Sequence, residues 1–272
     1  MKNILITGHD GFIGKQLKVF LKEKGYNTIT IEQDIRDPIK INKKIDVLIH
    51  LAAWLDNQDK EKIYDINVNG TLNLLNFCRD NNIKFIFAST NQVYGNQKNL
   101  PTKESDKYNP YNLYGKTKIE GENLCKKYSE SYNLNCIILR LSNVYGKDMK
   151  EGYAIYDILY GTKNNKTIHL NQPDVRRDFI HIKDVMGAFL KSIEYNKRKF
   201  DIFNISYGKS YALEEIVDIV SKFLKKDVSV EYSRAFKEEV LDNYQDISHA
   251  KSDLDWCPKI DFVQGINNLL SS

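Results

Sequence analysis

The chain has 272 residues, enough for one large α/β domain or for such a domain with a smaller lobe. A hydrophobic content of 42% supplies a sizeable core and argues against intrinsic disorder. The 40 basic and 36 acidic side chains are scattered along the chain, so the net charge of +4 predicts no nucleic-acid partner.

The first half alternates apolar, β-branched runs with segments of helical period. Strands are predicted at 3–7, 28–31, 46–52, 84–88 and 135–141. Helices are predicted at 12–25, around 61–81 and at 112–132. This alternation implies right-handed crossovers and a parallel sheet covered on both faces. The predicted fold is therefore α/β, with a doubly wound parallel Rossmann sheet.

After about residue 145 the pattern loosens. Further strands are predicted at 166–170, 200–206 and 228–232, and helices at 183–196, 212–225 and 261–270. We therefore predict a Rossmann domain at 1–145 and a smaller C-terminal α/β lobe at 146–272. The lobe is expected mainly to bind substrate, with some of its segments returning to the Rossmann sheet.

The cysteines and the N-terminus bear on location. The four cysteines show neither CxxC nor zinc-site spacing, so we expect no metal centre and place each thiol in or near the core. Reduced thiols favour the cytoplasm. The N-terminal apolar run is too short for a signal segment, and no run approaches the roughly 18 apolar residues that span a bilayer. The sequence predicts a soluble cytoplasmic protein without a membrane partner.

Gly8, Gly11 and Gly14 form GxxGxxG between the first strand and its helix. Residues without Cβ let a pyrophosphate approach the backbone, and the helix N-terminus offers N–H groups to it. Glu32 lies 18 positions beyond Gly14, near the spacing of an acid that binds the adenosine ribose. Such a carboxylate would repel a 2′-phosphate and favours NAD over NADP. Asp34 is the alternative acid.

A YxxxK spacing places a phenol and an ammonium on one face of a helix. The ammonium favours the phenolate and is expected to lower the pKa of the tyrosine toward a range useful for proton transfer. Three such pairs occur: Tyr94/Lys98, Tyr114/Lys118 and Tyr195/Lys199. The first lies in a predicted loop and the last in a predicted solvated charge run. Only the middle pair combines a helical setting with a place after a probable sheet strand.

Several motifs, in the same order, resemble those of the extended short-chain dehydrogenase/reductases, the NAD-dependent nucleotide-sugar epimerase/dehydratase family. They are TGHDGFIG (7–14), HLAA (50–53), NVNGTLNLL (67–75), STNQVYG (89–95), YGKTK (114–118), RLSNVYG (140–146) and RRDFIHIKDV (176–185). The resemblance covers nearly the whole chain. It implies NAD as cofactor and a nucleotide-diphosphate sugar as substrate.

The resemblance also implies roles for individual residues. Thr90 would hydrogen-bond the sugar oxygen that Tyr114 protonates or deprotonates, while Lys118 would hydrogen-bond the nicotinamide ribose. The alternative for Thr90 is a hydroxyl that satisfies a backbone group at a strand end. Asn143 and Arg177 would contact the diphosphate of the substrate. The implied cofactor-binding residues are Gly8, Gly11, Phe12, Ile13, Gly14, Glu32, Asp34, Ile35, Leu51, Ala52, Ala53, Asn67, Tyr114 and Lys118.

The reaction is narrowed by the two residues after Thr90. Related 4,6-dehydratases carry carboxylates there, whereas this chain has Asn91 and Gln92, whose amides have no usable proton chemistry near neutrality. The expectation is a 4-epimerase acting by hydride transfer at a sugar carbinol. A nucleotide 4-keto-6-deoxy-sugar reductase using NAD(P)H is the main alternative, ahead of a dehydratase or a non-enzymatic NAD-dependent binding protein.

Two family expectations concern the shape of the protein. The segment EQDIRDPIKINKKI (32–45) is too short for a strand and helix usual in the family, which leaves open whether Glu32 or Asp34 binds the ribose. A homodimer is implied through a four-helix bundle built from the helices at 61–81 and 112–132. The segments LLNFC (74–78) and LCKKY (124–128) could supply the apolar outer faces that such a bundle needs.

Overall fold

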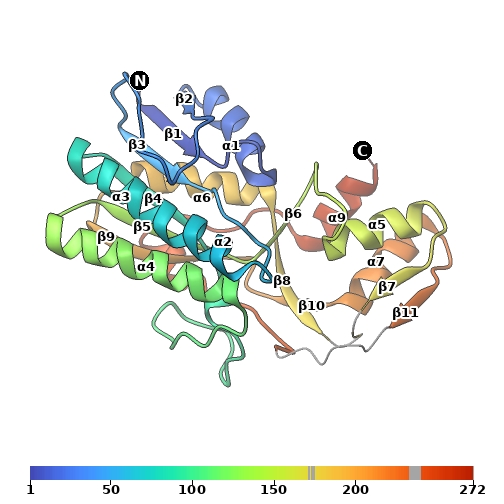
Figure 1. Ribbon diagram of the computed structural model, residues 1–272. Coiled ribbons are helices and arrows are strands. Elements are labelled where there is room, and N and C mark those ends of the chain that lie inside the picture. The colour runs from blue at the N-terminus through green and yellow to red at the C-terminus, as the bar shows by residue number, and fades with distance from the viewer. Residues whose placement is uncertain (171, 173–174, 233–239, 272) are drawn as a thin grey trace.

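The computed structural model describes residues 1–170, 172, 175–232 and 240–271 (Figure 1). Its main sheet has six strands in the order β2-β1-β3-β4-β5-β9, and every pairing in it is parallel. These strands are β1 Asn3–Thr7, β2 Asn27–Thr30, β3 Val47–His50, β4 Lys84–Thr90, β5 Cys136–Leu141 and β9 Phe200–Ile205. The predicted α/β class with a parallel Rossmann sheet is confirmed.

The helices of the described residues are α1 Phe12–Glu23, α2 Lys60–Tyr64, α3 Gly70–Asn81, α4 Leu113–Tyr132, α5 Ala154–Lys163, α6 Ile182–Glu194, α7 Leu213–Leu224, α8 Ser248–Ser252 and α9 Phe262–Ser271. A π-helical turn, η1, spans Asp65–Asn69, and a 3-10 turn, η2, spans Asn91–Val93. In the part of the chain described here, no helix has the length and apolar character that a membrane span requires.

Alternate residues of the sheet face two separate cores. Ile4 and Ile6 of β1 pack into the layer that holds α1 and α6. Leu5 of the same strand faces the opposite layer, where α3 and α4 lie side by side (Figure 1). Side chains alternate along a strand, so a strand that is apolar at every position can fill both cores.

The predicted elements of the first half are present with small shifts. β1 has its predicted bounds, β3 ends at His50, earlier than predicted, and β4 continues beyond its predicted end to Thr90. The helix predicted at 61–81 is interrupted by η1 between α2 and α3. Residues 31–46 contain no helix or strand, in agreement with the short segment noted in the sequence.

Two segments of the second half pack with the main sheet, one as a strand within it and one as a helix that covers it. β9 pairs with β5, and α6 packs against α1. The other strands form two small sheets from β6 Asn143–Tyr145, β7 Ile168–Leu170, β8 Arg176–His181, β10 Ser210–Ala212 and β11 Val230–Tyr232. The sequence analysis missed β6, β8, β10, α5 and α8, most of which are short. The division into domains at 145/146 stays a prediction.

Three expectations about single residues need correction. Cys257 is exposed, unlike the other three cysteines, which are buried as expected. Tyr195 does not belong to a solvated charge run, because its ring is buried against Phe203 and its hydroxyl donates a hydrogen bond to Asp201. In LLNFC the side chains of Leu74, Leu75 and Cys78 face the sheet, so they provide no outward apolar face.

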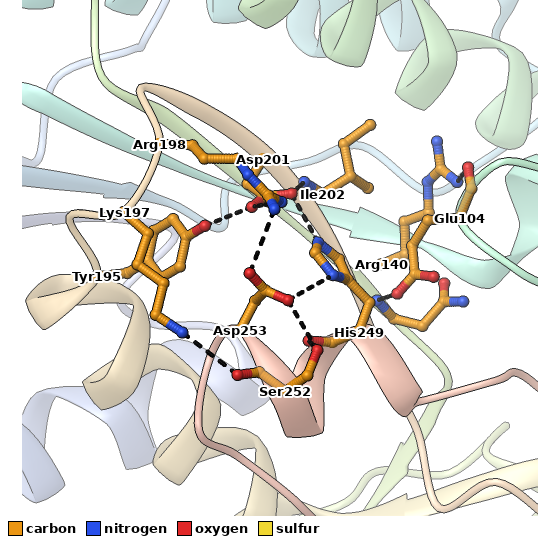
Figure 2. A network of polar contacts seen from close by, with 11 residues as sticks. Glu104, Arg140, Tyr195, Lys197, Arg198, Asp201, Ile202, His249, Ser252 and Asp253 are labelled. Carbon is orange, nitrogen blue, oxygen red and sulfur yellow. Dashed lines mark hydrogen bonds and ion pairs between the residues drawn. The ribbon is translucent and has the colours of Figure 1, made fainter.

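Asp201, near the start of β9, is the centre of a polar network that holds α8 against the sheet (Figure 2). Its carboxylate accepts hydrogen bonds from Tyr195 and, at 3.0 Å, from Arg198. Nε2 of His249 in α8 lies 2.8 Å from Oδ1 of Asp201, and its Nδ1 lies 3.3 Å from a carboxylate oxygen of Asp253. This network lies at the amino end of β9, away from the carboxyl ends of the strands.

Candidate active site

In the turn between β1 and α1, Gly8 and Gly14 pack so closely against neighbouring backbone that neither position could hold a Cβ atom. A Cβ at Gly8, whose φ is +70°, would lie 2.6 Å from the backbone nitrogen of Ala52, and one at Gly14 would lie 2.1 Å from the Gly8 oxygen. A Cβ at Gly11 would meet only the Gly8 oxygen, at 3.3 Å. Gly11 caps α1 without a side-chain hydrogen bond, so it leaves the N–H groups of the first turn to a ligand.

Three cavities adjoin along the carboxyl ends of the strands. One of about 410 Å³ and one of about 440 Å³ share Gly8, Gly11, Leu51 and Ala53 as lining residues. A third, of about 270 Å³, shares Asn143, Val144 and Tyr153 with the first. We call these the central, ribose-side and lobe cavities. The glycine turn thus lies where the central and ribose-side cavities meet.

The central cavity brings together the three residues predicted to be catalytic. Thr90 at the end of β4 and Tyr114 and Lys118 in the first turns of α4 all line it. The Lys118 ammonium lies 5.7 Å from the centre of the Tyr114 ring and donates a hydrogen bond of 2.8 Å to the Ala88 oxygen. Helical spacing and strand order therefore place one phenol, one ammonium and one small alcohol around a common space.

Thr90 combines both roles considered from the sequence. Its hydroxyl accepts a hydrogen bond of 3.2 Å from the backbone nitrogen of Gln92 and so caps η2. The same side chain lines the central cavity. The hydroxyl therefore satisfies a backbone group and still borders the space for a substrate.

Glu32 and Asp34, between which the sequence could not decide, both line the ribose-side cavity but differ in their contacts. Asp34 binds Arg36 through contacts of 2.6 and 3.0 Å, and Arg36 also binds Asp65 at 2.6 Å. These hydrogen bonds to Arg36 lower the pKa of Asp34 to about 2. The Glu32 carboxylate is 86% exposed and lies 3.3 Å from Nε2 of His9. Glu32 is therefore the less engaged acceptor.

Asn67 supports the site from behind the cavity wall. It lies in η1, is 2% exposed, and lines none of the three cavities. Its amide accepts from the Trp54 nitrogen at 2.7 Å and donates to the Trp54 oxygen at 2.9 Å and to Thr117 at 3.0 Å. Asn67 thus ties the loop after β3 to α4. Short π-helical segments such as η1 are frequent at functional sites.

A buried chain of hydrogen bonds continues from Asn67 to β1. The Thr71 hydroxyl donates to the backbone oxygen of Asn67 at 2.6 Å, so it must accept from Nε2–H of His50, which lies 3.0 Å away. Nδ1 of His50 then accepts from the Thr7 hydroxyl at 2.7 Å. Burial, aided by the charge of Lys118, lowers the pKa of His50 well below its usual value. The chain therefore fixes one neutral tautomer.

The matching family model is described as the NAD dependent epimerase/dehydratase family, and it covers residues 4–206. The chain belongs to this family. A putative UDP-glucose 4-epimerase of Methanocaldococcus jannaschii is 34% identical over 98% of this chain and 97% of its own length. The extended short-chain dehydrogenase/reductase resemblance inferred from the motifs is confirmed, and the protein is an enzyme of an NAD-dependent family.

Two solved structures of named epimerases share the fold. The UDP-glucose 4-epimerase of Thermotoga maritima, with UDP-glucose, is 26% identical and has a TM-score of 0.91 over 99% of this chain and 97% of its own. The UDP-N-acetylglucosamine 4-epimerase of Methanobrevibacter ruminantium, in complex with UDP-N-acetylmuramic acid, is also 26% identical, with a TM-score of 0.90 over the same shares of the two chains.

The cavities fit the NAD of this family. The glycine turn and the first turn of α1 suit a pyrophosphate, since Gly11 adds no side chain there. Glu32, Asp34, Ile35 and Ala52 line the ribose-side cavity, and the nicotinamide end would meet Tyr114 and Lys118 in the central one. Phe12, Ile13 and Gly14 line the central cavity, and Leu51 and Ala53 line both.

The sequence predicts that Lys118 lowers the pKa of Tyr114, and the protein alone does not show this. Burial raises the pKa of Tyr114, with a further rise from the Tyr153 phenol. Burial also lowers the pKa of Lys118 to about 8, which the Glu122 carboxylate partly opposes. The prediction of a lowered tyrosine pKa is wrong for this state, because desolvation of the phenolate outweighs the ammonium.

The substrate-side residues divide between the cavities. Asn143 borders both the central and the lobe cavity and donates a hydrogen bond of 2.9 Å to the Asp178 oxygen. Arg177 lines only the lobe cavity, where its Nη1 donates to the Val240 oxygen at 2.8 Å. Gln92 accepts from Asn112, the N-cap of α4, at 2.7 Å, so its amide stabilises the start of the catalytic helix.

The residues of the central cavity that sequence reasoning missed include Leu55, Lys150 and Tyr153. The Tyr153 ring packs edge-on against Phe12, with centroids 5.9 Å apart, and lies between the central and lobe cavities. All three lie outside helices and strands, where no hydrophobic period marks a buried or functional position.

His50 predicts a pH dependence of stability. Below a pH of about 6.5 the unfolded chain binds a proton at this residue that the native protein excludes, so stability falls as pH falls, by up to about 1.4 kcal/mol per pH unit. The variant His50→Gln does not titrate there. We expect the difference in unfolding free energy between the parent and this variant to shrink from pH 7 to pH 5 in urea unfolding.

The variant Thr71→Ser is the control, because it keeps both the hydroxyl and the histidine. It should follow the pH dependence of the parent. A difference between the parent and His50→Gln that stays constant or widens toward pH 5 would show that His50 is protonated in the native state.

Proposed function

We propose that this protein is an NAD-dependent nucleotide-sugar 4-epimerase that acts by hydride transfer at a sugar carbinol. The observation that carries the proposal is the convergence of Thr90, Tyr114 and Lys118 on one cavity beside the glycine turn. Relatives across nearly the whole chain are named UDP-glucose 4-epimerase, which supports C4 as the reacting carbon.

In the proposed mechanism the phenol of Tyr114 exchanges a proton with the oxygen at C4. Thr90 donates or accepts a hydrogen bond at the same oxygen and holds it in place. NAD, when bound, would supply the hydride acceptor and donor for C4. Lys118 would hold the nicotinamide ribose, and its positive charge next to the phenol favours the phenolate when the sugar hydroxyl must lose its proton. The central cavity would have to let the sugar ring turn over, so that both of its faces can be presented at C4.

The two residues after Thr90 argue against water elimination. Asn91 and Gln92 both border the central cavity, but neither side chain can hold or release a proton near neutral pH. The Gln92 amide is also engaged by Asn112. The arrangement supports reversible hydride transfer without a dehydratase step.

The first test incubates the protein with a panel of UDP- and GDP-hexoses and follows inversion at C4. Inversion without net NADH formation is expected, and Tyr114→Phe should lower kcat at least about 100-fold without changing NAD affinity. Tyr132→Phe, an exposed tyrosine at the end of the same helix, is the control and should retain the parent rate.

Other outcomes of this panel would replace the proposal. Steady NAD(P)H consumption with nucleotide 4-keto-6-deoxy sugars would identify a reductase, and loss of water would identify a dehydratase. Full cellular function of Tyr114→Phe would point to an NAD-dependent binding protein.

The second test concerns cofactor choice. We propose that Glu32, rather than the Arg36-bound Asp34, accepts hydrogen bonds from the adenosine ribose. Glu32→Gln removes the charge that would repel a 2′-phosphate, so the ratio of the Kd for NADP to the Kd for NAD should fall about tenfold in titration calorimetry. Glu23→Gln, at the exposed end of α1, is the control. An unchanged ratio in Glu32→Gln would assign discrimination to another group.

Two further parts of the proposal concern assembly and location. We propose a homodimer through α3 and α4, the pair that forms a four-helix bundle in the family, and a cytoplasmic location, which the free thiols favour. The outer face of α4 carries exposed Lys116, Glu120 and Asn123, so such a bundle would be polar at its centre. Light scattering should give twice the chain mass, 63.4 kDa from 2 × 31.7 kDa. A mass of one chain would reject the dimer.

A further inference from the structure

Arg140 of the RLSNVYG motif has no part in the proposed chemistry, yet it is one of the most completely bonded side chains in the protein. It is 1% exposed. Nε contacts both Glu122 oxygens at 3.0 and 3.2 Å, and Nη2 donates to Glu122 at 2.7 Å and to the Tyr108 hydroxyl at 2.9 Å. Nη1 donates to the Tyr94 hydroxyl at 2.7 Å and to the Glu104 oxygen at 3.0 Å. All five N–H groups therefore have acceptors.

Glu122 joins this arginine to the catalytic elements. It follows Tyr114 and Lys118 on α4 at intervals of four residues, and it is also 1% exposed. Its carboxylate accepts from the Ser89 hydroxyl and from Tyr108 at 2.8 Å. Ser89 directly precedes Thr90 on β4. The ion pair thus connects α4 with the end of the strand that carries Thr90.

The same pair holds the long connection between η2 and α4, which separates Thr90 from Tyr114 along the chain. Arg140 contacts this connection at Tyr94, Glu104 and Tyr108. The first two also reach β9, since the Tyr94 hydroxyl donates to Asn204 at 2.6 Å and Glu104 accepts from the Asn204 nitrogen at 2.8 Å. Figure 2 shows Arg140 and Glu104 next to each other at the margin of the Asp201 network.

We propose that the buried Arg140–Glu122 pair is a positioning device that fixes Thr90 on β4 relative to Tyr114 and Lys118 on α4. A buried ion pair is a weak source of stability, because desolvation offsets most of its attraction and apolar side chains of similar size often replace it without loss. Its contacts instead converge on β4 and α4, which carry the catalytic residues, and on the connection between them. The kinetic part of this inference rests on the proposed epimerase function.

The test removes the pair as a unit. Glu122→Leu combined with Arg140→Met leaves no unpaired buried charge, so the double variant should fold with an unfolding midpoint near that of the parent. We expect kcat to fall about 30-fold, because reacting groups lose their alignment, while KM for the nucleotide sugar and Kd for NAD stay within about threefold. Amide exchange in residues 94–112 should accelerate about tenfold by mass spectrometry.

Asp201→Ala is the matched control, because it breaks a polar network at the amino end of β9, and the hydrogen bonds of Asp201 within the described residues reach neither Glu122 nor the connection at residues 94–112 (Figure 2). It should lower the unfolding midpoint but leave kcat and the exchange of residues 94–112 within about twofold of the parent. A double variant with parental kcat and exchange would overturn the proposal. So would an equal loss of kcat in Asp201→Ala at the same folded fraction, since that loss would reflect general destabilisation.

Tyr108→Phe covers the case in which the double variant does not fold. Tyr108 is 39% exposed, and its loss removes one hydrogen bond from each member of the pair. We expect kcat to fall about threefold with unchanged KM, and a parental kcat would reject the proposal. If the parent itself inverts no sugar, the proposed function fails, whereas the exchange of residues 94–112 still judges the positioning role on its own.

Discussion

Parallel strand pairing brings the carboxyl ends of β1, β3, β4 and β5 to one edge of the sheet, and the site depends on this constraint. Gly8 follows β1, Ala52 follows β3, Thr90 ends β4 and Asn143 follows β5. Residues far apart in sequence therefore border adjoining cavities. The crossover helices then add the two remaining groups, since α1 presents its N-terminus and α4 its first turns.

Burial sets the electrostatics of this edge. It raises the pKa of Tyr114 and lowers those of Lys118 and His50, in each case because the charged form loses its hydration. The protein counters this cost differently at each position. Lys118 binds a backbone oxygen, His50 stays neutral between two threonines, and Glu122 is matched by Arg140. The polar groups around the cavity are thus largely oriented before any ligand binds.

The sequence predicted the sheet, its helices and the residues that the central cavity gathers, because each rests on a local signal. Apolar runs mark strands, glycine spacing marks the turn, and four-residue spacing marks Tyr114 and Lys118. It could not predict β6, β8 or β10, whose pairing is non-local, nor Tyr153, which lies in a segment without period. The sequence also could not predict that the pKa of Tyr114 is raised, because desolvation depends on how the side chain is packed. The choice between Glu32 and Asp34 became clearer only through the contacts of Arg36.

The short segment 31–46 has a consequence for how copies of this protein meet one another. Among the described residues no strand lies beyond β2, so β2 is an outer strand whose outward N–H and C=O groups could recruit a strand from a neighbouring molecule. It spans only Asn27–Thr30, opens with an exposed asparagine, and alternates threonine at its second and fourth positions. A strand this short and polar is a poor template for pairing with another molecule. The fold therefore lacks the strand and helix usual in the family without exposing a strand that is prone to aggregation.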